Sequence, residues 1–278
     1  MTAFRDKLLA AMRRSDSLLC VGLDIDPGRV PPTLLDDAGW IETFNRGIVE
    51  ATSDLVCAYK PNLAFYEALG LQGWEGLRRT LAAIPPDIPV IADAKRGDIG
   101  STSQAYARAL FDELGFDAAT LTAYVGLEGL EPFLRYDDRG LLILCKTSNP
   151  GSGDFQDLVV EWRGERLPLY QVVARRVVEW NGRGNCGLVV GATYPSQLQE
   201  IRALAPDLPI LIPGVGTQQG SLEKAVRLGT DARGELAIIN VSRSISYAGG
   251  GDDWQTAARA EALRTVERIR RSRLATAT

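Results

Sequence analysis

Short apolar runs recur along the whole chain of 278 residues, and they alternate with segments of helical periodicity. Each run is continuously apolar, which is typical of parallel strands that are covered by helices. The runs start about 31 residues apart on average, which is the size of one strand–helix unit. We predict eight strands, at Leu18–Leu23, Leu55–Tyr59, Pro89–Ala92, Ala118–Leu121, Leu141–Cys145, Gly187–Val190, Ile210–Ile212 and Ala237–Val241.

Eight such units predict an α/β fold, a (β/α)8 TIM barrel, and a barrel of this kind commonly needs about 250 residues. A doubly wound sheet is the weaker alternative because it usually has fewer strands. Helical periodicity predicts helices at Leu71–Ala83, Ser101–Leu114 and Leu222–Leu228. No Pro/Ser-rich linker divides the chain, so we expect one domain over residues 1–278.

The longest interval between predicted strands follows the fifth one. It begins with a turn-rich loop, Asn149 to Asp157, and continues into a helix at Leu169–Trp180. We therefore expect an enlarged segment around residues 149–185. At the other end of the chain, Thr256–Arg273 becomes strongly basic. We interpret it as an outer helix whose cations favour the helix dipole, rather than as a phosphate-binding or nucleic-acid-binding tail.

The chain contains no histidine, and this excludes several kinds of chemistry. Ser-His-Asp and Cys-His nucleophile systems, His-ligated zinc and imidazole acid–base catalysis are all ruled out. Proton transfer in an enzyme of this composition falls to Lys, Asp, Glu, Tyr or Cys. The formal net charge of -4 also argues against a general surface for nucleic acid or membranes.

The four cysteines lie in or beside apolar runs, and none of them forms a C-x-x-C pair. We expect buried, reduced thiols at Cys20, Cys57, Cys145 and Cys186. The first residues lack the long apolar stretch of a signal peptide, and no stretch approaches 18 apolar residues. The expected location is the cytoplasm.

The polar residues that follow the third predicted strand carry the strongest functional signal, because barrel chemistry lies at the carboxyl ends of strands. Asp93 and Lys95 are two residues apart, so both should face the barrel mouth. Asp98 follows in the loop, within reach of the same ammonium or of a neighbouring subunit's site. An ammonium between carboxylates stays protonated and is a well-held proton donor.

Lys60, which ends the neighbouring strand, would extend this array of alternating charges. The alternative is a buried network of ion pairs without chemistry. Buried pairs are weak stabilisers, so several of them at the catalytic face of a barrel favour a function.

A second signal follows the seventh and eighth strands, where barrels commonly bind phosphate. Gly214 and Gly216 allow backbone N–H groups to approach an anion, and Arg243 adds a guanidinium that can hold phosphate through two hydrogen bonds. The alternative is that the glycines only serve a turn.

The segment from Val90 to Thr102 reads V-I-A-D-A-K-R-G-D-I-G-S-T and matches the pattern D-x-K-x-x-D-I-x-x-T. With it, further polar residues fall in order at the strand ends: Asp24, Lys60, Ser148, Gln218 and Arg243. In these residues the chain resembles the orotidine 5′-phosphate decarboxylase family, specifically its longer bacterial branch. The resemblance extends roughly from Leu18 to Tyr247.

This resemblance implies the loss of carbon dioxide from orotidine 5′-monophosphate to give UMP in de novo pyrimidine biosynthesis. By the same resemblance, Lys95 donates a proton to C6 of the pyrimidine and Asp93 lies near the departing carboxylate. Asp98 of the partner subunit would hold Lys95, and Lys60 would bridge Asp93 and the ribose. The expected active unit is a homodimer with sites at its interface.

The resemblance also assigns the substrate contacts. Asp24 and Thr102 of the partner subunit would bind the ribose hydroxyls, and Ser148 would bind the pyrimidine ring. Gln218 and Arg243 would hold the phosphate, together with a backbone N–H of Ser242. The expected ligand is a small nucleotide; no metal, cofactor, nucleic acid or membrane is implied.

Two other functions remain open. Sugar-phosphate enzymes of the same superfamily, such as hexulose-phosphate synthase or keto-gulonate-phosphate decarboxylase, share D-x-K-x-x-D but typically need magnesium and tend to use a histidine. A non-catalytic phosphate-binding barrel would have no reason to carry every member of the charge array. Asn62 and Tyr66 follow Lys60, and we interpret them as helix-start or packing residues.

Overall fold

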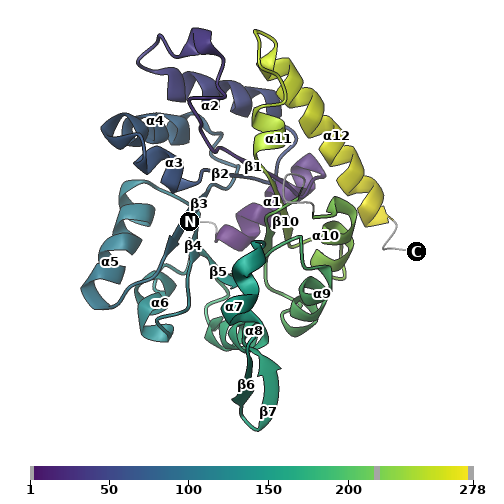
Figure 1. The fold of residues 1–278 in the computed structure, drawn as a ribbon. Helices are drawn as coiled ribbons and strands as arrows, with labels where there is room; N and C mark the ends of the chain where they lie inside the picture. Colours follow the sequence, from purple (N-terminus) through teal and green to yellow (C-terminus); the bar gives the residue numbers. More distant parts are fainter. Residues whose placement is uncertain (1–2, 216–219, 275–278) are drawn as a thin grey trace.

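Eight parallel strands form one sheet that surrounds the centre of the molecule in the computed structural model, which describes residues 3–215 and 220–274 (Figure 1). The order of neighbouring strands is β2-β1-β10-β9-β8-β5-β4-β3. Isolated parallel bridges from Tyr59 to Val90 and from Asn62 to Asp93 join the two edges. The predicted TIM barrel is therefore confirmed, and the doubly wound alternative is wrong.

The barrel strands are β1 (Leu19–Gly22), β2 (Ala58–Lys60), β3 (Ile91–Arg96), β4 (Ala118–Leu121), β5 (Gly140–Lys146), β8 (Cys186–Val190), β9 (Ile210–Ile212) and β10 (Ala237–Val241). Three of them, β4, β9 and β10, have the predicted bounds. The bounds of β2 and β3 differ from the predicted ones. Leu55–Cys57 is buried but precedes β2, and β3 continues beyond the apolar run into the charged residues.

Helices surround the barrel (Figure 1). They are α1 (Phe4–Ser15), α2 (Trp40–Thr52), α3 (Leu63–Glu67), α4 (Gly70–Ala83), α5 (Gly100–Arg108), α6 (Leu127–Leu134), α7 (Gly153–Gln156), α8 (Leu169–Trp180), α9 (Pro195–Leu204), α10 (Leu222–Gly229), α11 (Arg243–Ser246) and α12 (Trp254–Leu274). Short 3-10 helices lie at η1 (Pro32–Leu34) and η3 (Pro150–Ser152), and α5 continues into one π-helical turn, η2 (Ala109–Glu113).

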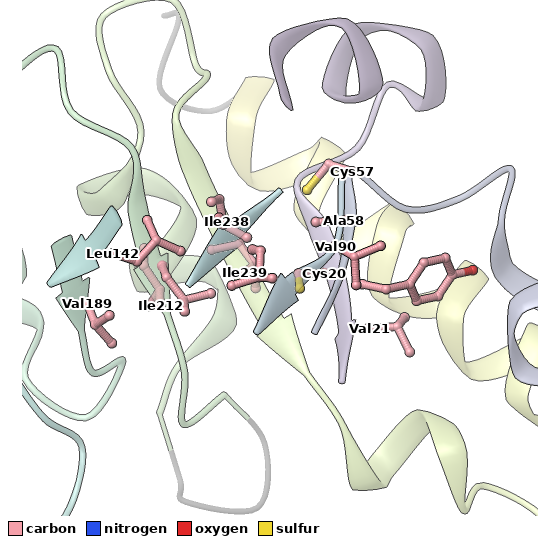
Figure 2. Packing of buried hydrophobic residues seen from close by; sticks show 14 of the residues in the cluster. Cys20, Val21, Cys57, Ala58, Val90, Leu142, Val189, Ile212, Ile238 and Ile239 are labelled. Atoms are coloured by element: carbon pink, nitrogen blue, oxygen red, sulfur yellow. The ribbon is translucent and has the colours of Figure 1, made fainter. Parts of the chain in front are cut away.

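The core is built from apolar side chains of different strands that pack together, as Figure 2 shows for Leu142, Val189, Ile212, Ile238 and Ile239. Strands β1, β4, β8, β9 and β10 are buried at every position, which explains why their sequences are almost entirely apolar.

All four cysteines are buried free thiols, as expected. Burial raises the pKa of the Cys145 thiol to about 12, so this residue stays a thiol at neutral pH. Among the described residues, no helix is long and apolar enough to cross a bilayer.

The basic end of α12 belongs to the barrel's outer layer. Arg268 pairs with Glu223 of α10, and both Arg270 and Arg273 pair with Asp16 after α1. These ion pairs support the interpretation of the segment as an outer helix with cations in its last turn.

The segment between β5 and β8 contains a two-stranded hairpin that sequence analysis did not predict. Its antiparallel strands are β6 (Val159–Trp162) and β7 (Glu165–Pro168), and it projects away from the barrel (Figure 1). The guanidinium of Arg163 lies 4.4 Å from the ring centre of Trp162, so a cation–π contact helps to hold the hairpin. The helix that follows, α8, has the predicted bounds.

Arg202 of α9 links the amino-terminal ends of two barrel strands. Its guanidinium is buried and donates hydrogen bonds to five backbone carbonyls, those of Ala205, Pro206, Leu208, Gly229 and Leu236. Burial lowers the pKa of Arg202 to about 10, and the more distant carboxylates of Asp207 and Asp231 oppose that shift.

We expect Arg202→Met to lower the free energy of unfolding by about 3–5 kcal/mol, because it leaves several buried carbonyls without a donor. Urea unfolding measures this loss. The exposed Arg227 on α10 offers a matched control, and Arg227→Met should cost no more than about 0.5 kcal/mol. A loss below about 1 kcal/mol for Arg202→Met would contradict the assigned role.

Candidate active site

A cavity of about 500 Å³ opens at the carboxyl ends of the barrel strands. Many of the site residues predicted from the sequence line this cavity: Asp24, Lys60, Asp93, Lys95, Ser148, Gly214, Ser242 and Arg243. Gly216 and Gln218 lie outside the described residues. The volume falls within the range of small-molecule sites, about 300–1,000 Å³.

Asp93 on β3 is the centre of the charge array. One of its carboxylate oxygens, Oδ2, lies 3.0 Å from Nζ of Lys60 on β2, and the other, Oδ1, lies 2.6 Å from Nζ of Lys95. The side chain of Lys60 is 3% exposed, whereas that of Lys95 is 51% exposed. Lys60 is therefore a buried partner of Asp93, while Lys95 extends toward the open part of the cavity.

The backbone around Lys95 departs from an ideal strand. Lys95 has a φ of 48°, and the register of β3 against β4 shifts between Ala92 and Arg96. Thr120 of β4 supports this bend, because its Oγ1 accepts hydrogen bonds from the N–H groups of Ala94 and Lys95, both at 3.0 Å. A positive φ at a non-glycine residue costs on the order of 1–3 kcal/mol and commonly occurs at functional sites.

Thr120 also donates a hydrogen bond of 3.1 Å from Oγ1 to Oδ1 of Asp93. It lines the cavity, yet sequence analysis did not select it. Its position within a short buried strand was the available signal, but the sequence does not reveal which face of such a strand points inward.

The pKa values in this array are set by opposing effects. Burial would raise the pKa of Asp93, but the ammonium groups of Lys60 and Lys95 outweigh it and hold that pKa well below its usual range. Burial would lower the pKa of Lys60, but Asp93 and then Asp24 outweigh it and raise that pKa well above its usual range.

These directions determine how the pair responds to pH. Asp93 contributes stability that is present above its unfolded pKa of about 3.9 and is lost as the pH falls through its lower folded value. Lys60 contributes stability that is present below its unfolded pKa of about 10.4 and is lost as the pH rises through its higher folded value. Both stability contributions are therefore fully present from about pH 5 to pH 9, between the two unfolded pKa values.

The opposite part of the cavity is built from residues that follow β9 and β10. Gly214 has a φ of 90°, a backbone conformation that favours glycine. Ser242 packs directly over Gly22, where a Cβ would lie 1.9 Å from the serine Oγ. Arg243 begins α11 and faces the same cavity. This region therefore combines a guanidinium with backbone that a ligand can approach closely.

Asp24 follows β1 and is positioned through its backbone. Tyr247 donates a hydrogen bond of 2.8 Å to the Asp24 carbonyl, and its hydroxyl accepts one of 2.8 Å from the N–H of Asp26. The Asp24 Oδ1 atom is buried with no hydrogen-bond partner among the described residues. A buried carboxylate oxygen without a donor is suited to accept a hydrogen bond from a ligand hydroxyl.

Asp98 and Thr102 lie outside the lining of this cavity. Asp98 accepts a hydrogen bond of 2.8 Å from the N–H of Ile99 rather than holding Lys95, and Thr102 is exposed on α5. A single chain therefore does not bring these two predicted residues to the site.

Asn62 and Tyr66 have the structural roles expected of them. Asn62 is the N-cap of α3 and accepts a hydrogen bond of 3.2 Å from the N–H of Ala64, although it also lines the cavity. Tyr66 is fully buried and donates to the carbonyl of Leu23. Asn240 of β10 also lines the cavity without having been selected, and its Oδ1 has no partner among the described residues.

The described residues contain no group of three or more His, Cys, Asp and Glu side chains placed to hold a metal ion.

Comparison with known proteins identifies the family. The model of the Orotidine 5'-phosphate decarboxylase / HUMPS family matches residues 17–260. Orotidine 5'-phosphate decarboxylase from Herpetosiphon aurantiacus is 55% identical over 257 residues, which cover 92% of this chain and 94% of that protein.

Solved structures agree. The OMP decarboxylase of Leishmania donovani superimposes with a TM-score of 0.85 at 41% identity, covering 98% of this chain and 100% of that one. The UMP synthase of the same organism gives a TM-score of 0.88 at 42% identity, covering 99% of this chain but only 57% of that longer chain. The chain belongs to the Orotidine 5'-phosphate decarboxylase / HUMPS family, as an enzyme that decarboxylates orotidine 5′-phosphate.

Proposed function

We propose that the cavity at the carboxyl ends of the strands is where orotidine 5′-monophosphate loses carbon dioxide to become UMP, in pyrimidine biosynthesis and without a metal or organic cofactor. The observation that carries this assignment is Asp93 held between the ammonium groups of Lys60 and Lys95 inside the cavity. Loss of carbon dioxide leaves an electron pair on C6 of the pyrimidine, and a fixed ammonium stabilises that charge electrostatically.

In this mechanism the bond between C6 and the carboxylate breaks, and its electron pair stays on C6. Lys95 then donates a proton from Nζ to C6, and its half-exposed position allows solvent to replace that proton. Asp93 lies near the departing carboxylate, and their repulsion destabilises the bound substrate relative to the transition state. Lys60 keeps Asp93 ionised and bridges it to the ribose.

The remaining groups bind the substrate. Asp24 offers its unpartnered oxygen to a ribose hydroxyl, and Ser148 binds the pyrimidine ring. Arg243 holds the phosphate, supported by three backbone positions and one further side chain: Gly214, Gly216, Ser242 and Gln218. Binding energy from the phosphate, remote from C6, helps to organise the site.

The active form in this proposal is a homodimer with sites at its interface. Asp98 and Thr102 come from the partner subunit, Asp98 to hold Lys95 and Thr102 to bind the ribose. Their position outside the cavity of their own chain supports this arrangement. We also propose that the chain is a single domain with an enlarged segment around residues 149–185, and that it acts in the cytoplasm on a small nucleotide, without nucleic acid or membrane.

The test is an assay of purified protein treated with a chelator. We expect it to convert orotidine 5′-monophosphate to UMP, measured by chromatography of both nucleotides, with no gain in rate when Mg²⁺ is added. Turnover of a sugar phosphate that requires Mg²⁺ would favour the related sugar-phosphate enzymes. Binding of UMP without any turnover by the folded protein would favour a non-catalytic phosphate-binding barrel.

A further inference from the structure

A second buried lysine lies beside the cavity, although it is not one of the described residues that line it. Lys146 is the last residue of β5, and its side chain is 0% exposed. The three residues that follow it, Thr147, Ser148 and Asn149, do line the cavity. Lys146 therefore stands where the strand passes into the loop that carries the proposed pyrimidine contact.

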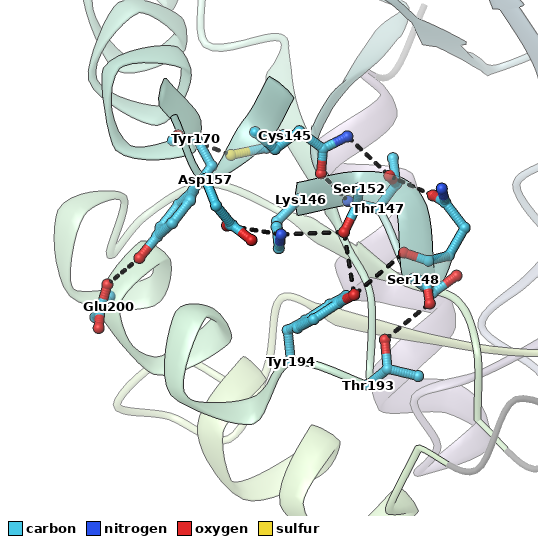
Figure 3. A network of polar contacts seen from close by, with 12 residues as sticks. Cys145, Lys146, Thr147, Ser148, Ser152, Asp157, Tyr170, Thr193, Tyr194 and Glu200 are labelled. Atoms are coloured by element: carbon cyan, nitrogen blue, oxygen red, sulfur yellow. Dashed lines mark hydrogen bonds and ion pairs between the residues drawn. The ribbon is translucent and has the colours of Figure 1, made fainter. Parts of the chain in front are cut away.

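The ammonium of Lys146 ties this loop to the strand (Figure 3). Its Nζ lies 2.7 Å from Oδ1 of Asp157 and 3.0 Å from Oγ of Ser152, and it sits 4.3 Å from the ring centre of Tyr194. Asp157 follows α7, at the far end of the loop, so the ion pair joins the two ends of residues 147–156.

From the ammonium, hydrogen bonds run in one direction to the edge of the cavity. Lys146 donates to Ser152, Ser152 Oγ donates to the Tyr194 hydroxyl at 3.1 Å, and Tyr194 donates to the Asn149 carbonyl at 3.1 Å. Each hydroxyl accepts one bond and donates the next. Such a chain is polarised by the charge at its start, so each bond strengthens its neighbour.

Three further hydrogen bonds hold Thr147 and Ser148. Thr193 donates a hydrogen bond of 3.1 Å from Oγ1 to the Ser148 carbonyl (Figure 3). The side chain of Gln156 accepts from the N–H of Thr147 at 2.9 Å and donates to its Oγ1 at 2.8 Å. Ser148 thus sits in a backbone that is held on both sides, and it lines the cavity.

A buried ammonium is a costly way to stabilise a fold, since an apolar side chain of similar size often does as well. Its particular property here is direction: it donates hydrogen bonds to Asp157 and Ser152, and its charge lies over the Tyr194 ring. We propose that Lys146 is a positioning residue that sets the orientation of Ser148 toward the pyrimidine through this network. The inference rests on the proposed function of Ser148.

The test compares Lys146→Met with the wild-type protein, using UMP and ribose 5-phosphate as probes in calorimetry. Ribose 5-phosphate keeps the ribose and the phosphate but lacks the base. We expect the Kd for UMP to rise about tenfold, roughly the loss of one well-placed hydrogen bond, and the Kd for ribose 5-phosphate to change by less than about twofold. In turnover, KM should rise about tenfold while kcat changes less than about threefold.

Lys7 provides a matched control. Its Nζ lies 2.7 Å from Oδ1 of Asp117, the same distance as in the Lys146 pair, but Asp117 directly precedes β4 at the other end of the barrel. Lys7→Met should lower the melting temperature without changing either Kd. If Lys146→Met does not fold, Tyr194→Phe removes one link of the chain, and we expect it to raise the Kd for UMP about threefold with the same selectivity.

The possible results separate this inference from the proposed function. An unchanged Kd for UMP in folded variants, or an equal loss for both probes, would overturn the positioning role while wild-type turnover stands. Failure of the wild-type protein to decarboxylate orotidine 5′-monophosphate would overturn the proposed function, and the inference with it.

Discussion

Replacing Lys95 by alanine is expected to reduce kcat by about 10⁴-fold or more, without loss of the folded barrel. The ammonium of Lys95 has two roles in the proposed mechanism, the stabilisation of charge at C6 and the donation of the proton. Positioned proton donors contribute about 10²–10⁴-fold, and fixed electrostatic groups about 10²–10³-fold. Of the two lysines that line the cavity in the described part of the chain, Lys95 is half-exposed and Lys60 is buried, so Lys60 cannot replace Lys95.

The measurement is single-turnover conversion of orotidine 5′-monophosphate at saturating enzyme, which separates chemistry from product release. Lys224→Ala, at an exposed lysine of α10, serves as the control and should leave kcat within about twofold of the wild type. Sedimentation should give the same oligomeric state for both variants. A wild-type kcat in Lys95→Ala would show that Lys95 neither stabilises the charge at C6 nor donates the proton.

The elements that sequence analysis placed best are those whose local pattern and final environment agree. Strand β10 is apolar at nearly every position and is buried throughout, so its bounds follow from its composition. Strand β3 was predicted too short, because the apolar run ends at Ala92 while the backbone pairing continues to Arg96. Two of the residues beyond Ala92, Asp93 and Lys95, are charged and line the cavity, and this function overrides the strand pattern.

The hairpin of β6 and β7 escaped prediction for a different reason. It lies outside the barrel and has no fully buried position: exposed and half-buried residues alternate along β6, whereas β7 has two exposed residues followed by two half-buried ones. Its turn uses Arg163 and Gly164, both with positive φ, where Asn-Gly or Asp-Gly would have marked a hairpin in the sequence. Its turn chemistry and packing are therefore weak signals in a single sequence.

Only part of the candidate site was predicted from the sequence. Charged residues at strand ends were selected because barrel chemistry lies at the carboxyl ends of strands, and Asp93 and Lys60 do meet in the cavity. Thr120 and Asn240 were not selected, since a polar residue inside a buried strand faces either the cavity or the surrounding helices. Choosing between these faces requires the closed barrel, which no short stretch of sequence contains.

Mixing two inactive variants is expected to restore about a quarter of wild-type activity. Lys95→Ala and Asp98→Ala should each be nearly inactive alone, because each homodimer lacks one of these groups at both sites. In a heterodimer, one site receives Lys95 from one subunit and Asp98 from the other, while the second site loses both. Random exchange of equal amounts makes about half of all dimers mixed, and half of their sites are complete.

The experiment requires that subunits exchange, so heterodimer formation is verified with two distinguishable tags before activity is measured. A control mixture of Lys95→Ala with Asp93→Asn should remain inactive, since both residues belong to β3 of one chain and form an ion pair within that chain. Recovery in the first mixture and not in the second would assign Asp98 to the partner's site. Verified heterodimers without activity would mean that Asp98 acts on its own chain, where it would have to leave the N–H of Ile99 to reach Lys95.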